Sequence, residues 1–194
     1  MGEPAAWDIL HDSLHADCTV FKVHRQRCKH PHDSREGDFF VIRCADWVLA
    51  LPVTRDGRLV LVRQFRFGTR SLSWEPPGGV LDAGEEPLAA ARRETREETG
   101  YTAARARVLG HCSPNPAILG NRAHFVLLED CEPGAPVDLD PNEEVEVGLF
   151  TADEAVRMIL DGRMHHAIAV NALFHLRAAR PDLFGAERGA RGAE

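Results

Sequence analysis

The sequence contains little lysine, a single tyrosine and no long apolar segment. Lys22 and Lys29 are its only lysines among 23 basic residues, and Tyr101 is its only tyrosine. No apolar run reaches the ~18 residues that a membrane-spanning helix needs. The chain also does not begin with a basic segment followed by a long apolar one. We therefore expect no membrane partner, no signal peptide and a cytoplasmic protein.

The cysteine count and the net charge exclude further classes of protein. There are five cysteines and no Cys-x-x-Cys pair, so neither a disulfide framework nor a zinc site is expected. The net charge of −7 argues against a general nucleic-acid-binding protein. Phosphate groups can still bind to an acidic protein where a metal ion supplies positive charge locally.

At 194 residues, 44% of them hydrophobic, the chain is long enough to bury a substantial core. Residues 1–37 are expected to be an N-terminal strand segment, 38–180 the main domain, and 181–194 a flexible tail. Alternating apolar residues predict strands at 19–27, 39–43, 47–53, 59–65, 72–76, 106–111, 122–128 and 145–150. Helices are expected at 87–99, 152–162 and 166–179. A helix between strands and further helices late in the chain predict a mixed α/β sandwich.

Residues 79–101 read GVLDAGEEPLAAARRETREETGY and carry the strongest functional signal. Glu94, Glu97 and Glu98 lie at positions i, i+3 and i+4, which places three carboxylates on one face of a helix. Each like-charge pair there costs a few tenths of a kcal/mol, which a divalent cation would remove. Hard cations such as Mg²⁺ prefer oxygen ligands, usually carboxylates together with substrate phosphates. The stretch therefore predicts a platform for Mg²⁺ and a phosphorylated substrate.

This stretch resembles the Nudix box, G-x5-E-x7-R-E-U-x-E-E-x-G-U, in which U is a bulky apolar residue. Every fixed position matches, and the single departure is Thr95 at the first apolar position, which we interpret as a packing variant. The resemblance implies a Nudix-type α/β/α sandwich with a mixed sheet. It also implies an enzyme that hydrolyses a diphosphate bond with the help of two or three Mg²⁺ or Mn²⁺ ions.

Three flanking segments are similar to the ADP-ribose pyrophosphatase and nucleoside diphosphate sugar hydrolase branch of that family. They are residues 61–66 (LVRQFR), 74–79 (WEPPGG) and 113–118 (SPNPAI), in which Pro116 matches a proline of the branch. The products would be a nucleoside monophosphate and a sugar phosphate, with ADP-ribose as the first-choice substrate. GDP-mannose or another nucleotide sugar remains an alternative, as does a non-catalytic nucleotide sensor.

The resemblance also assigns site residues. The metal ligands would be the Gly78 carbonyl, Glu94, Glu97 and Glu98, with Glu85 supporting the loop or binding a metal through water. Arg93 would hold a neighbouring carboxylate. The general base in this branch often comes from an acidic loop after the box, and here Glu143 and Glu144 are the two candidates.

Four further residues are candidates for substrate binding: Arg63, Arg66, Glu75 and Trp47. A planar guanidinium suits a diphosphate, which favours Arg66, although a surface arginine would also fit that position. Trp47 could stack on a base, but a buried strand tryptophan is the alternative. The histidines, His165 and His166 included, are expected on the surface. The N-terminal strand segment is expected to join two copies into a homodimer.

Overall fold

The computed structural model describes residues 3–139 and 141–185, which belong to two compact units. One unit comprises Met1–Ala45 and Ser113–Arg122, and the other Asp46–Cys112 and Ala123–Glu194. The first compact unit thus includes residues 38–45, and the domain bounds expected from the sequence, 1–37 and 38–180, stay a prediction. Residues Glu36–Arg43 pair with Lys22–Lys29, and Ile42 also bridges Leu119, so their backbone hydrogen bonds belong to the N-terminal unit.

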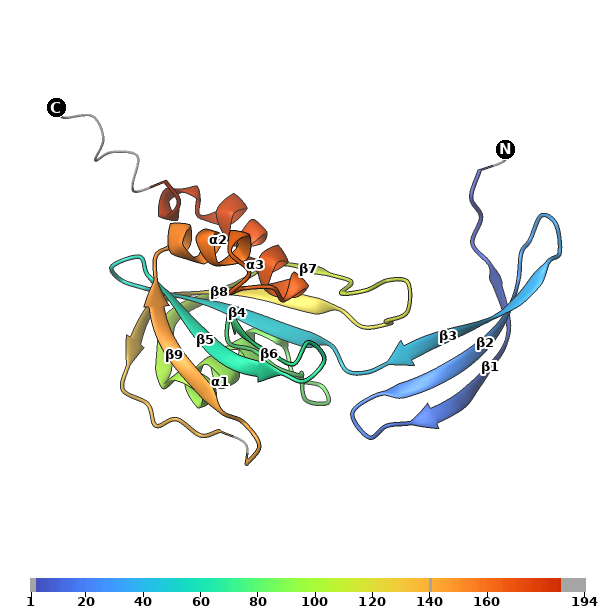
Figure 1. Ribbon diagram of the computed structural model, residues 1–194, viewed down its shortest axis with the longest axis horizontal. Coiled ribbons are helices and arrows are strands. Elements are labelled where there is room, and N and C mark those ends of the chain that lie inside the picture. The colour runs from blue at the N-terminus through green and yellow to red at the C-terminus, as the bar shows by residue number, and fades with distance from the viewer. Residues whose placement is uncertain (1–2, 140, 186–194) are drawn as a thin grey trace. The chain divides into compact units, whose positions relative to one another are not determined.

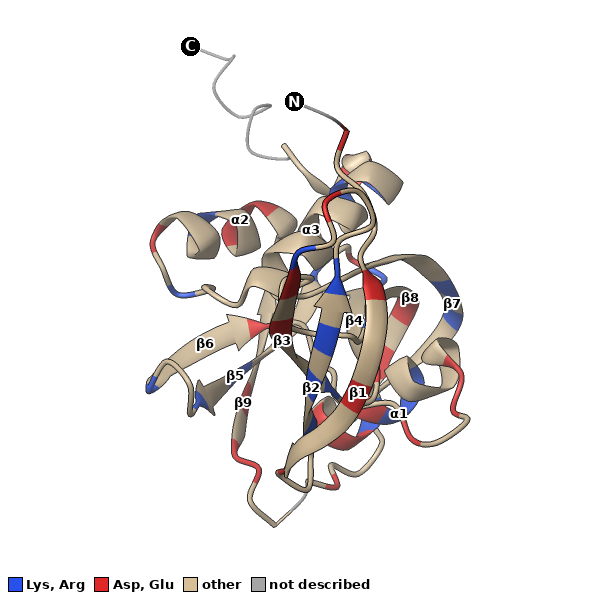
Figure 2. Ribbon diagram, turned by 90° about the vertical axis from the view of Figure 1, so that its right-hand side faces the viewer, with Lys and Arg blue, Asp and Glu red and all other residues tan. Residues whose placement is uncertain are grey.

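The N-terminal unit is a three-stranded antiparallel sheet in the order β1-β2-β3. Its strands are β1 (Asp8–Asp17), β2 (Lys22–Lys29) and β3 (Glu36–Arg43). Figure 2 shows basic residues along β2 and acidic residues on its two neighbours. Arg25 contacts Asp38 at 2.6 Å. Pairing of opposite charges across strands supports this register.

The expected strand at 19–27 was placed too early, and β1 was missed. Thr19 has a φ of 66°, in the left-handed region, and its N–H donates to Asp17 Oδ1 in the turn that joins β1 to β2. The β1 sequence, DILHDSLHAD, has few apolar residues and gives little periodic signal. Its hydrogen bonds come from β2 in a hairpin, and the turn at residues 18–21, CTVF, contains no glycine, asparagine or proline to mark it in the sequence.

The second unit is built on a six-stranded mixed sheet (Figure 1). Its order is β6-β5-β4-β8-β7, and β9 pairs with β5. The β4–β8 pair is parallel and the other pairs are antiparallel. The strands are β4 (Trp47–Thr54), β5 (Leu59–Arg66), β6 (Ser71–Glu75), β7 (Tyr101–Cys112), β8 (Ala123–Pro133) and β9 (Val145–Phe150).

Helices cover both faces of this sheet (Figure 1). They are α1 (Pro87–Thr99), α2 (Ala152–Leu160) and α3 (Ala167–Ala179). Strand β4 is buried on both sides, and its alternate residues serve two cores. Val48 and Ala50 pack with α1, whereas Leu49 and Leu51 pack with α2 and α3. The predicted α/β/α sandwich with a mixed sheet is confirmed.

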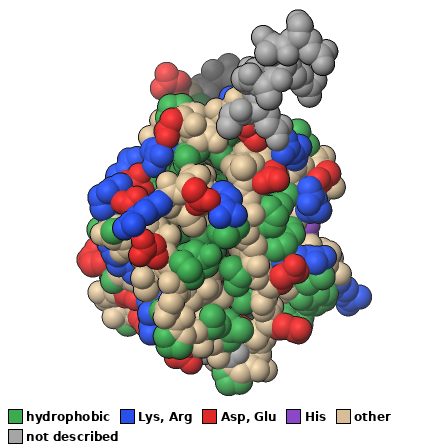
Figure 3. Space-filling view, turned by 90° about the vertical axis from the view of Figure 1, so that its left-hand side faces the viewer, with side chains coloured by type: hydrophobic (Ala, Val, Ile, Leu, Met, Phe, Trp, Pro, Cys, Tyr) green, Lys and Arg blue, Asp and Glu red, His purple; other side chains and the backbone are tan. Residues whose placement is uncertain are grey.

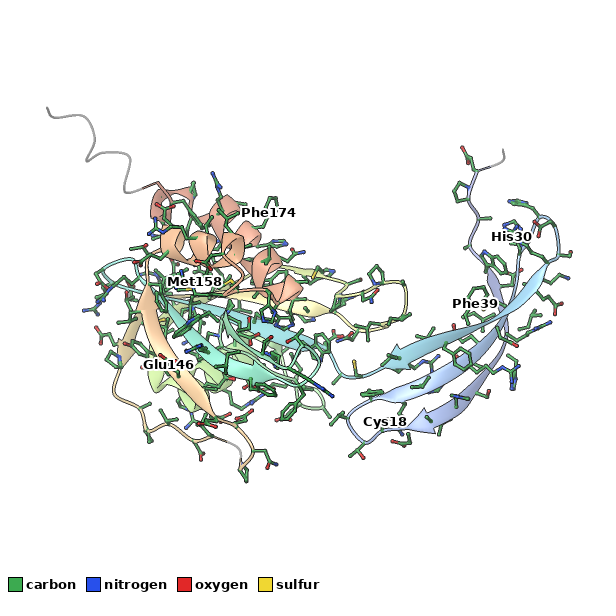
Figure 4. All side chains as sticks on the ribbon, in the orientation of Figure 1. Cys18, His30, Phe39, Glu146, Met158 and Phe174 are labelled. Atoms are coloured by element: carbon green, nitrogen blue, oxygen red, sulfur yellow. The ribbon has the colours of Figure 1, made fainter. Side chains whose placement is uncertain are left out.

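Helix α2 begins as expected at Thr151, whose side chain forms a capping box with Glu154. Met158 of α2 is buried against the sheet, whereas Phe174 on the outer side of α3 is 71% exposed (Figure 4). After α3, Leu183 and Phe184 pack against the same core. The remainder of the expected flexible tail, residues 186–194, lies outside the described residues. Within the described ranges, no helix is long and apolar enough to cross a membrane.

Candidate functional site

Helix α1 presents the carboxylates predicted from the sequence. Pro87 occupies the first helical position, where its missing N–H costs nothing. Gly100 ends the helix in the left-handed conformation, with φ 70°, and its N–H donates to the Arg96 carbonyl. The inward face of α1 carries Glu94 and Glu98 toward the loop that follows β6, and Glu98 is only 3% exposed.

The glycine pair of that loop allows a close approach to both β4 and α1. A Cβ atom on Gly78 would lie 2.1 Å from the Val48 carbonyl oxygen, and one on Gly79 would lie 2.4 Å from the Glu94 carboxylate. The Gly78 N–H donates to Glu98 Oε2 at 3.1 Å, which ties the loop to the helix. Only glycine fits at these two positions without movement of the backbone or the carboxylate.

Arg93 is the centre of a carboxylate network. Its guanidinium donates to both oxygens of Glu85, at 3.0 and 2.9 Å. A third nitrogen, Nη1, donates to Glu94 at 2.9 Å and to Glu97 at 3.2 Å. These bonds, led by the one to Glu85, hold the pKa of Arg93 above its usual range. The structure thus brings Arg93 together with three of the predicted acidic residues and fixes their side chains.

The two most buried carboxyls of the box have perturbed pKa values. Burial raises the pKa of Glu98 to about 8, and the negative charge of Glu94 adds to the rise. Burial also raises the pKa of Glu94, against the attraction of Arg93. Glu143 repels both groups. Carboxyls that resist ionisation in this way are stabilised by a nearby cation.

A cavity of about 600 Å³ lies between α1, the glycine loop and the acidic loop. Its walls include Glu94, Glu97, Glu98 and Glu143, together with Gly78, Gly79 and Arg93. On the face of the molecule drawn in Figure 3, acidic and basic side chains are interspersed. The cavity, in contrast, gathers carboxylates in one place, which favours a cationic ligand.

Three polar side chains of this cavity were not predicted: Gln64, Asp82 and Asp138. Gln64 lies two residues before Arg66 on β5, so its position on the same face could have been inferred from the strand period. Asp138 is fixed because its N–H donates to the Glu97 carbonyl at 2.9 Å. Nothing local in the sequence indicates that contact.

The donor set fits a divalent metal ion. In the described part of the chain, no three histidine, cysteine or acidic side chains are already arranged as a finished metal site. In this structure Glu94 and Glu97 accept hydrogen bonds from Arg93 Nη1. Hard carboxylate oxygens around a polar cavity nevertheless suit Mg²⁺ or a similar ion. Glu94, Glu97 and Glu98 would hold it, with Glu85 linked to them through Arg93.

A second cavity, of about 230 Å³, adjoins the first and shares Arg66, Gly78, Gly79 and Val80 with it. Its other walls are largely apolar and include Trp47, Pro76 and Ile168. Trp47 both lines this cavity and packs against the core, so the two interpretations of this residue are compatible. A charged compartment and an apolar compartment therefore meet at Arg66.

Glu75 and His166, together with Arg66, supply polar side chains of the second cavity. Glu75 is 1% exposed and accepts two hydrogen bonds from Arg66, at 2.8 and 2.7 Å. Its Oε2 is also 2.5 Å from His166 Nδ1. Burial would raise the pKa of Glu75, but the hydrogen bonds from His166 and Arg66 outweigh it and lower that pKa. The prediction that His166 is an ordinary surface histidine is wrong, because its ring is bound to a buried carboxylate.

Two predicted site residues lie elsewhere. Arg63 contacts Glu146 of β9, labelled in Figure 4, at 3.2 Å. Together with Glu144 and Phe65 it lines a separate cavity of about 520 Å³. Arg63 and Arg66 are three residues apart on a strand, so they point to opposite faces of the sheet. The structure therefore places Arg66 and Glu143 at the carboxylate cavity, and Arg63 and Glu144 away from it.

The fold and the complete box define a protein of the Nudix class. Residues 46–173 match the NUDIX domain, and the chain therefore belongs to the Nudix family. Members of this family generally use divalent metal ions. A solved structure described as an ADP compounds hydrolase superposes with a TM-score of 0.83 and 22% identity, covering 95% of this chain and 99% of that one. This likeness supports the fold.

Two curated relatives bear on the substrate. An ADP-ribose pyrophosphatase from Bacillus subtilis (strain 168) is 32% identical over 67% of this chain and 71% of its own length. A GDP-mannose pyrophosphatase from Klebsiella pneumoniae is also 32% identical, over 62% of this chain and 65% of its own length.

Proposed function

We propose that this protein is a metal-dependent Nudix hydrolase that cleaves the diphosphate bond of a nucleoside diphosphate sugar, with ADP-ribose as the first-choice substrate. The observation that supports it is the pair of adjoining cavities that share Arg66 and the glycine loop. One is rich in carboxylates and suits metal-bound phosphates, and the other has apolar walls that suit an uncharged part of the substrate. The similarity to an ADP-ribose pyrophosphatase supports the same class of substrate.

In the proposed reaction, water attacks one phosphorus of the diphosphate and the bond to the bridging oxygen breaks. The products are a nucleoside monophosphate and a sugar phosphate, AMP and ribose 5-phosphate in the case of ADP-ribose. Two or three Mg²⁺ or Mn²⁺ ions, when bound, would neutralise the phosphates and lower the pKa of the attacking water.

The residues of this chain have separate roles in that reaction. Glu94, Glu97 and Glu98 hold the ions, together with the Gly78 carbonyl. Arg93 orients Glu94 and Glu97 and links them to Glu85. Arg66 donates to the diphosphate oxygens, since its fork to Glu75 uses only Nε and one N–H of Nη2 and leaves three N–H groups for other acceptors. Glu143 accepts the proton of the attacking water.

The homodimer expected from the sequence belongs to the same proposal. The N-terminal sheet leaves several large apolar side chains about half exposed, among them Ile9, Leu14, Phe39 and Phe40. A small sheet seldom exposes so many without a partner, and a second copy of the chain is the partner we propose.

The test is a screen of ADP-ribose, GDP-mannose, ADP-glucose, NADH and dinucleoside polyphosphates with Mg²⁺ or Mn²⁺, followed by identification of both products. We expect ADP-ribose to have the highest kcat/KM. Preference for GDP-mannose, which the second relative favours, would establish the alternative substrate. Tight binding without turnover of any compound would establish a nucleotide sensor and overturn the enzymatic proposal.

A further inference from the structure

The contact between His166 and Glu75 joins two parts of the chain that are 91 residues apart. Glu75 is the last residue of β6, and His166 stands immediately before α3. Because Glu75 is almost fully buried and its pKa is lowered, its carboxylate is ionised and can only accept hydrogen bonds. His166 Nδ1 therefore carries the proton and donates it to Glu75 Oε2. The imidazole completes the set of donors around a buried charge.

The ring of His166 has no other structural role at the start of α3. His166 is the N-cap residue, but its side chain makes no capping hydrogen bond. The helix begins from its backbone carbonyl, which accepts from the Val170 N–H at 3.2 Å and the Ala169 N–H at 3.0 Å. Any residue can supply that carbonyl, so the side chain is not needed for the cap.

The segment before α3 is also held without the imidazole. The Trp74 N–H donates to the Arg163 carbonyl at 2.8 Å, which attaches the segment to β6 by its backbone. The Met164 N–H donates to the Met158 carbonyl at 2.8 Å, and Met164 itself is buried in the core. Replacement of the His166 ring should therefore leave this segment in place.

Arg66 reaches Glu75 by extending back along the sheet. In the ladder, Arg66 is opposite Ser71, whereas Glu75 is opposite Val62, four residues or about 13 Å away. The arginine side chain must be extended to form its two parallel bonds with the carboxylate. It is nevertheless 38% exposed and would otherwise sample many rotamers. The orientation of Glu75 thus determines where the guanidinium of Arg66 lies.

Arg66 and His166 bind the same oxygen of Glu75, because Oε2 accepts hydrogen bonds from both Arg66 Nη2 and His166 Nδ1. Without the imidazole, the carboxylate could rotate about its last bond and carry the guanidinium with it. Arg66 lines both cavities, so such a rotation would move the group proposed to bind the diphosphate. A guanidinium that is already fixed loses less entropy when it binds a phosphate.

We infer that His166 is a positioning residue that, through Glu75, fixes the Arg66 guanidinium at the junction of the two cavities for binding of the substrate diphosphate. This inference rests on the proposed function, because it needs a diphosphate at that junction. It assigns His166 no contact with the reacting atoms.

The test compares His166→Leu with His166→Asn. Leucine has a similar size and no donor, whereas the asparagine side chain can place an N–H near the position of Nδ1. We expect His166→Leu to raise KM for the best nucleotide sugar about tenfold with less than a threefold change in kcat. His166→Asn should restore most of the affinity. His165→Leu, which alters the exposed neighbouring imidazole, is the matched control and should resemble the wild type.

A double-mutant cycle separates positioning from a structural role. Arg66→Gln keeps a donor for Glu75 but removes the guanidinium. If His166 acts through Arg66, His166→Leu should have no further effect in the Arg66→Gln background. The same cycle is measured by calorimetry with a methylene-bridged, non-hydrolysable analogue of ADP-ribose and Mg²⁺, so that binding is observed without turnover.

Three outcomes would overturn the inference while leaving the proposed function intact. The first is an unchanged KM in His166→Leu. The second is an equal loss of affinity on adding His166→Leu to the wild type and to Arg66→Gln. The third is a His166→Asn variant that binds substrate as weakly as His166→Leu. A thermal melt of each variant identifies losses that come from unfolding. A wild-type protein that neither hydrolyses nor binds any nucleotide sugar would instead overturn the proposed function, and this inference with it.

Discussion

The backbone N–H of Gly78 donates a hydrogen bond of 3.1 Å to Oε2 of Glu98, across twenty residues of sequence. This bond joins the loop after β6 to the inward face of α1. It places the most buried carboxyl of the box beside the glycine whose carbonyl is a proposed metal ligand. The donor also opposes, without cancelling, the effect of burial on the pKa of Glu98. The loop and the helix are therefore bonded to each other where they line the carboxylate cavity.

Glu98→Gln should remove a ligand charge with little change in shape. We expect kcat to fall on the order of 10³-fold, because stabilisation of charge in the transition state is lost. Chelation by EDTA should abolish wild-type turnover, and Mg²⁺ or Mn²⁺ should restore it. Glu86→Gln is the matched control, since Glu86 is exposed at the start of the same helix. Near-normal turnover in Glu98→Gln would refute the metal assignment.

The stability of the metal-free protein should depend on pH through the same residue. The pKa of Glu98 is about 8 in the folded protein, against about 4.3 in an unfolded chain. Between these values the folded protein retains a proton that the unfolded chain releases. Folding is therefore favoured by this group at low pH, and its contribution is lost as the pH rises from about 4 to 8, by at most ~1.4 kcal/mol per pH unit.

The measurement is denaturant unfolding in EDTA at several pH values, for the wild type and for Glu98→Gln. The pKa of Glu94 is also raised, so Glu94 changes the stability of both proteins in the same direction. The effect of Glu98 is therefore the difference in unfolding free energy between the wild type and Glu98→Gln. We expect Glu98→Gln to gain stability relative to the wild type as the pH rises. A difference that does not change between pH 5 and 8 would show that Glu98 titrates normally.

The contrast between α1 and His166 shows what the sequence could predict. The first residue of α1, its end at Gly100 and its row of carboxylates depend on residues at most a few positions apart, so a local pattern contains them. The contact of His166 with Glu75 depends on how α3 meets β6, which no spacing expresses. Strand β1 was missed for a different reason, because the turn that joins it to β2 contains no glycine, asparagine or proline to mark a hairpin.

The positions of Arg63 and Gln64 follow from the strand period alone. Arg63 and Arg66 were both predicted to bind substrate, although a strand period of two places them on opposite faces. The same period would have selected Gln64, which does line the carboxylate cavity. The sequence could not choose between Glu143 and Glu144, because both lie in an irregular loop, where side chains follow no regular period.

Arg93→Lys should weaken the carboxylate network while retaining the positive charge. A lysine cannot form the two parallel bonds that Arg93 makes with Glu85, nor bond to Glu94 and Glu97 at the same time. Loss of a residue that orients metal ligands typically costs 10- to 100-fold in metal affinity or activity. We therefore expect the Mg²⁺ concentration needed for half-maximal activity to rise by about 10- to 100-fold.

The control for that prediction is Arg92→Lys. Arg92 is exposed on the same helix, and its side chain donates to the Ala103 carbonyl instead of a box carboxylate. It should leave the Mg²⁺ dependence unchanged. Equal effects of the two substitutions would mean that helix stability, and not the network, is being measured.

The N-terminal sheet should form a homodimer interface. Light scattering at micromolar concentration should report a dimer for the wild type. Phe39→Glu and Phe40→Glu are made separately, because consecutive strand residues point to opposite faces of the sheet and both rings are nearly half exposed. The substitution on the face that meets the partner should shift the protein toward the monomer. Phe174→Glu, on the exposed side of α3, is the control and should remain dimeric. A monomeric, fully active wild type would contradict the assembly we propose.

The last prediction concerns the general base, for which the sequence left Glu143 and Glu144 open. The cavity walls distinguish them: Glu143 lines the carboxylate cavity and repels Glu94 and Glu98, whereas Glu144 lines the separate cavity that contains Arg63. A base must come within hydrogen-bond reach of the water that it deprotonates. The helix glutamates are poor acceptors once they are committed to metal, so Glu143 is the residue we expect to act.

Glu143→Gln should therefore lower kcat by roughly 10²- to 10⁴-fold, the usual range for loss of a general base, with little change in KM or in metal affinity. Glu144→Gln is the matched control, one residue away in the same loop, and should keep at least half of the wild-type kcat. The measurement is steady-state kinetics at saturating Mg²⁺, together with a Mg²⁺ titration of each variant. If the single variants and the double variant all retain wild-type kcat, the base lies elsewhere. Glu97, which also lines the carboxylate cavity and is anchored there by Arg93 and Arg96, would then be the residue to replace.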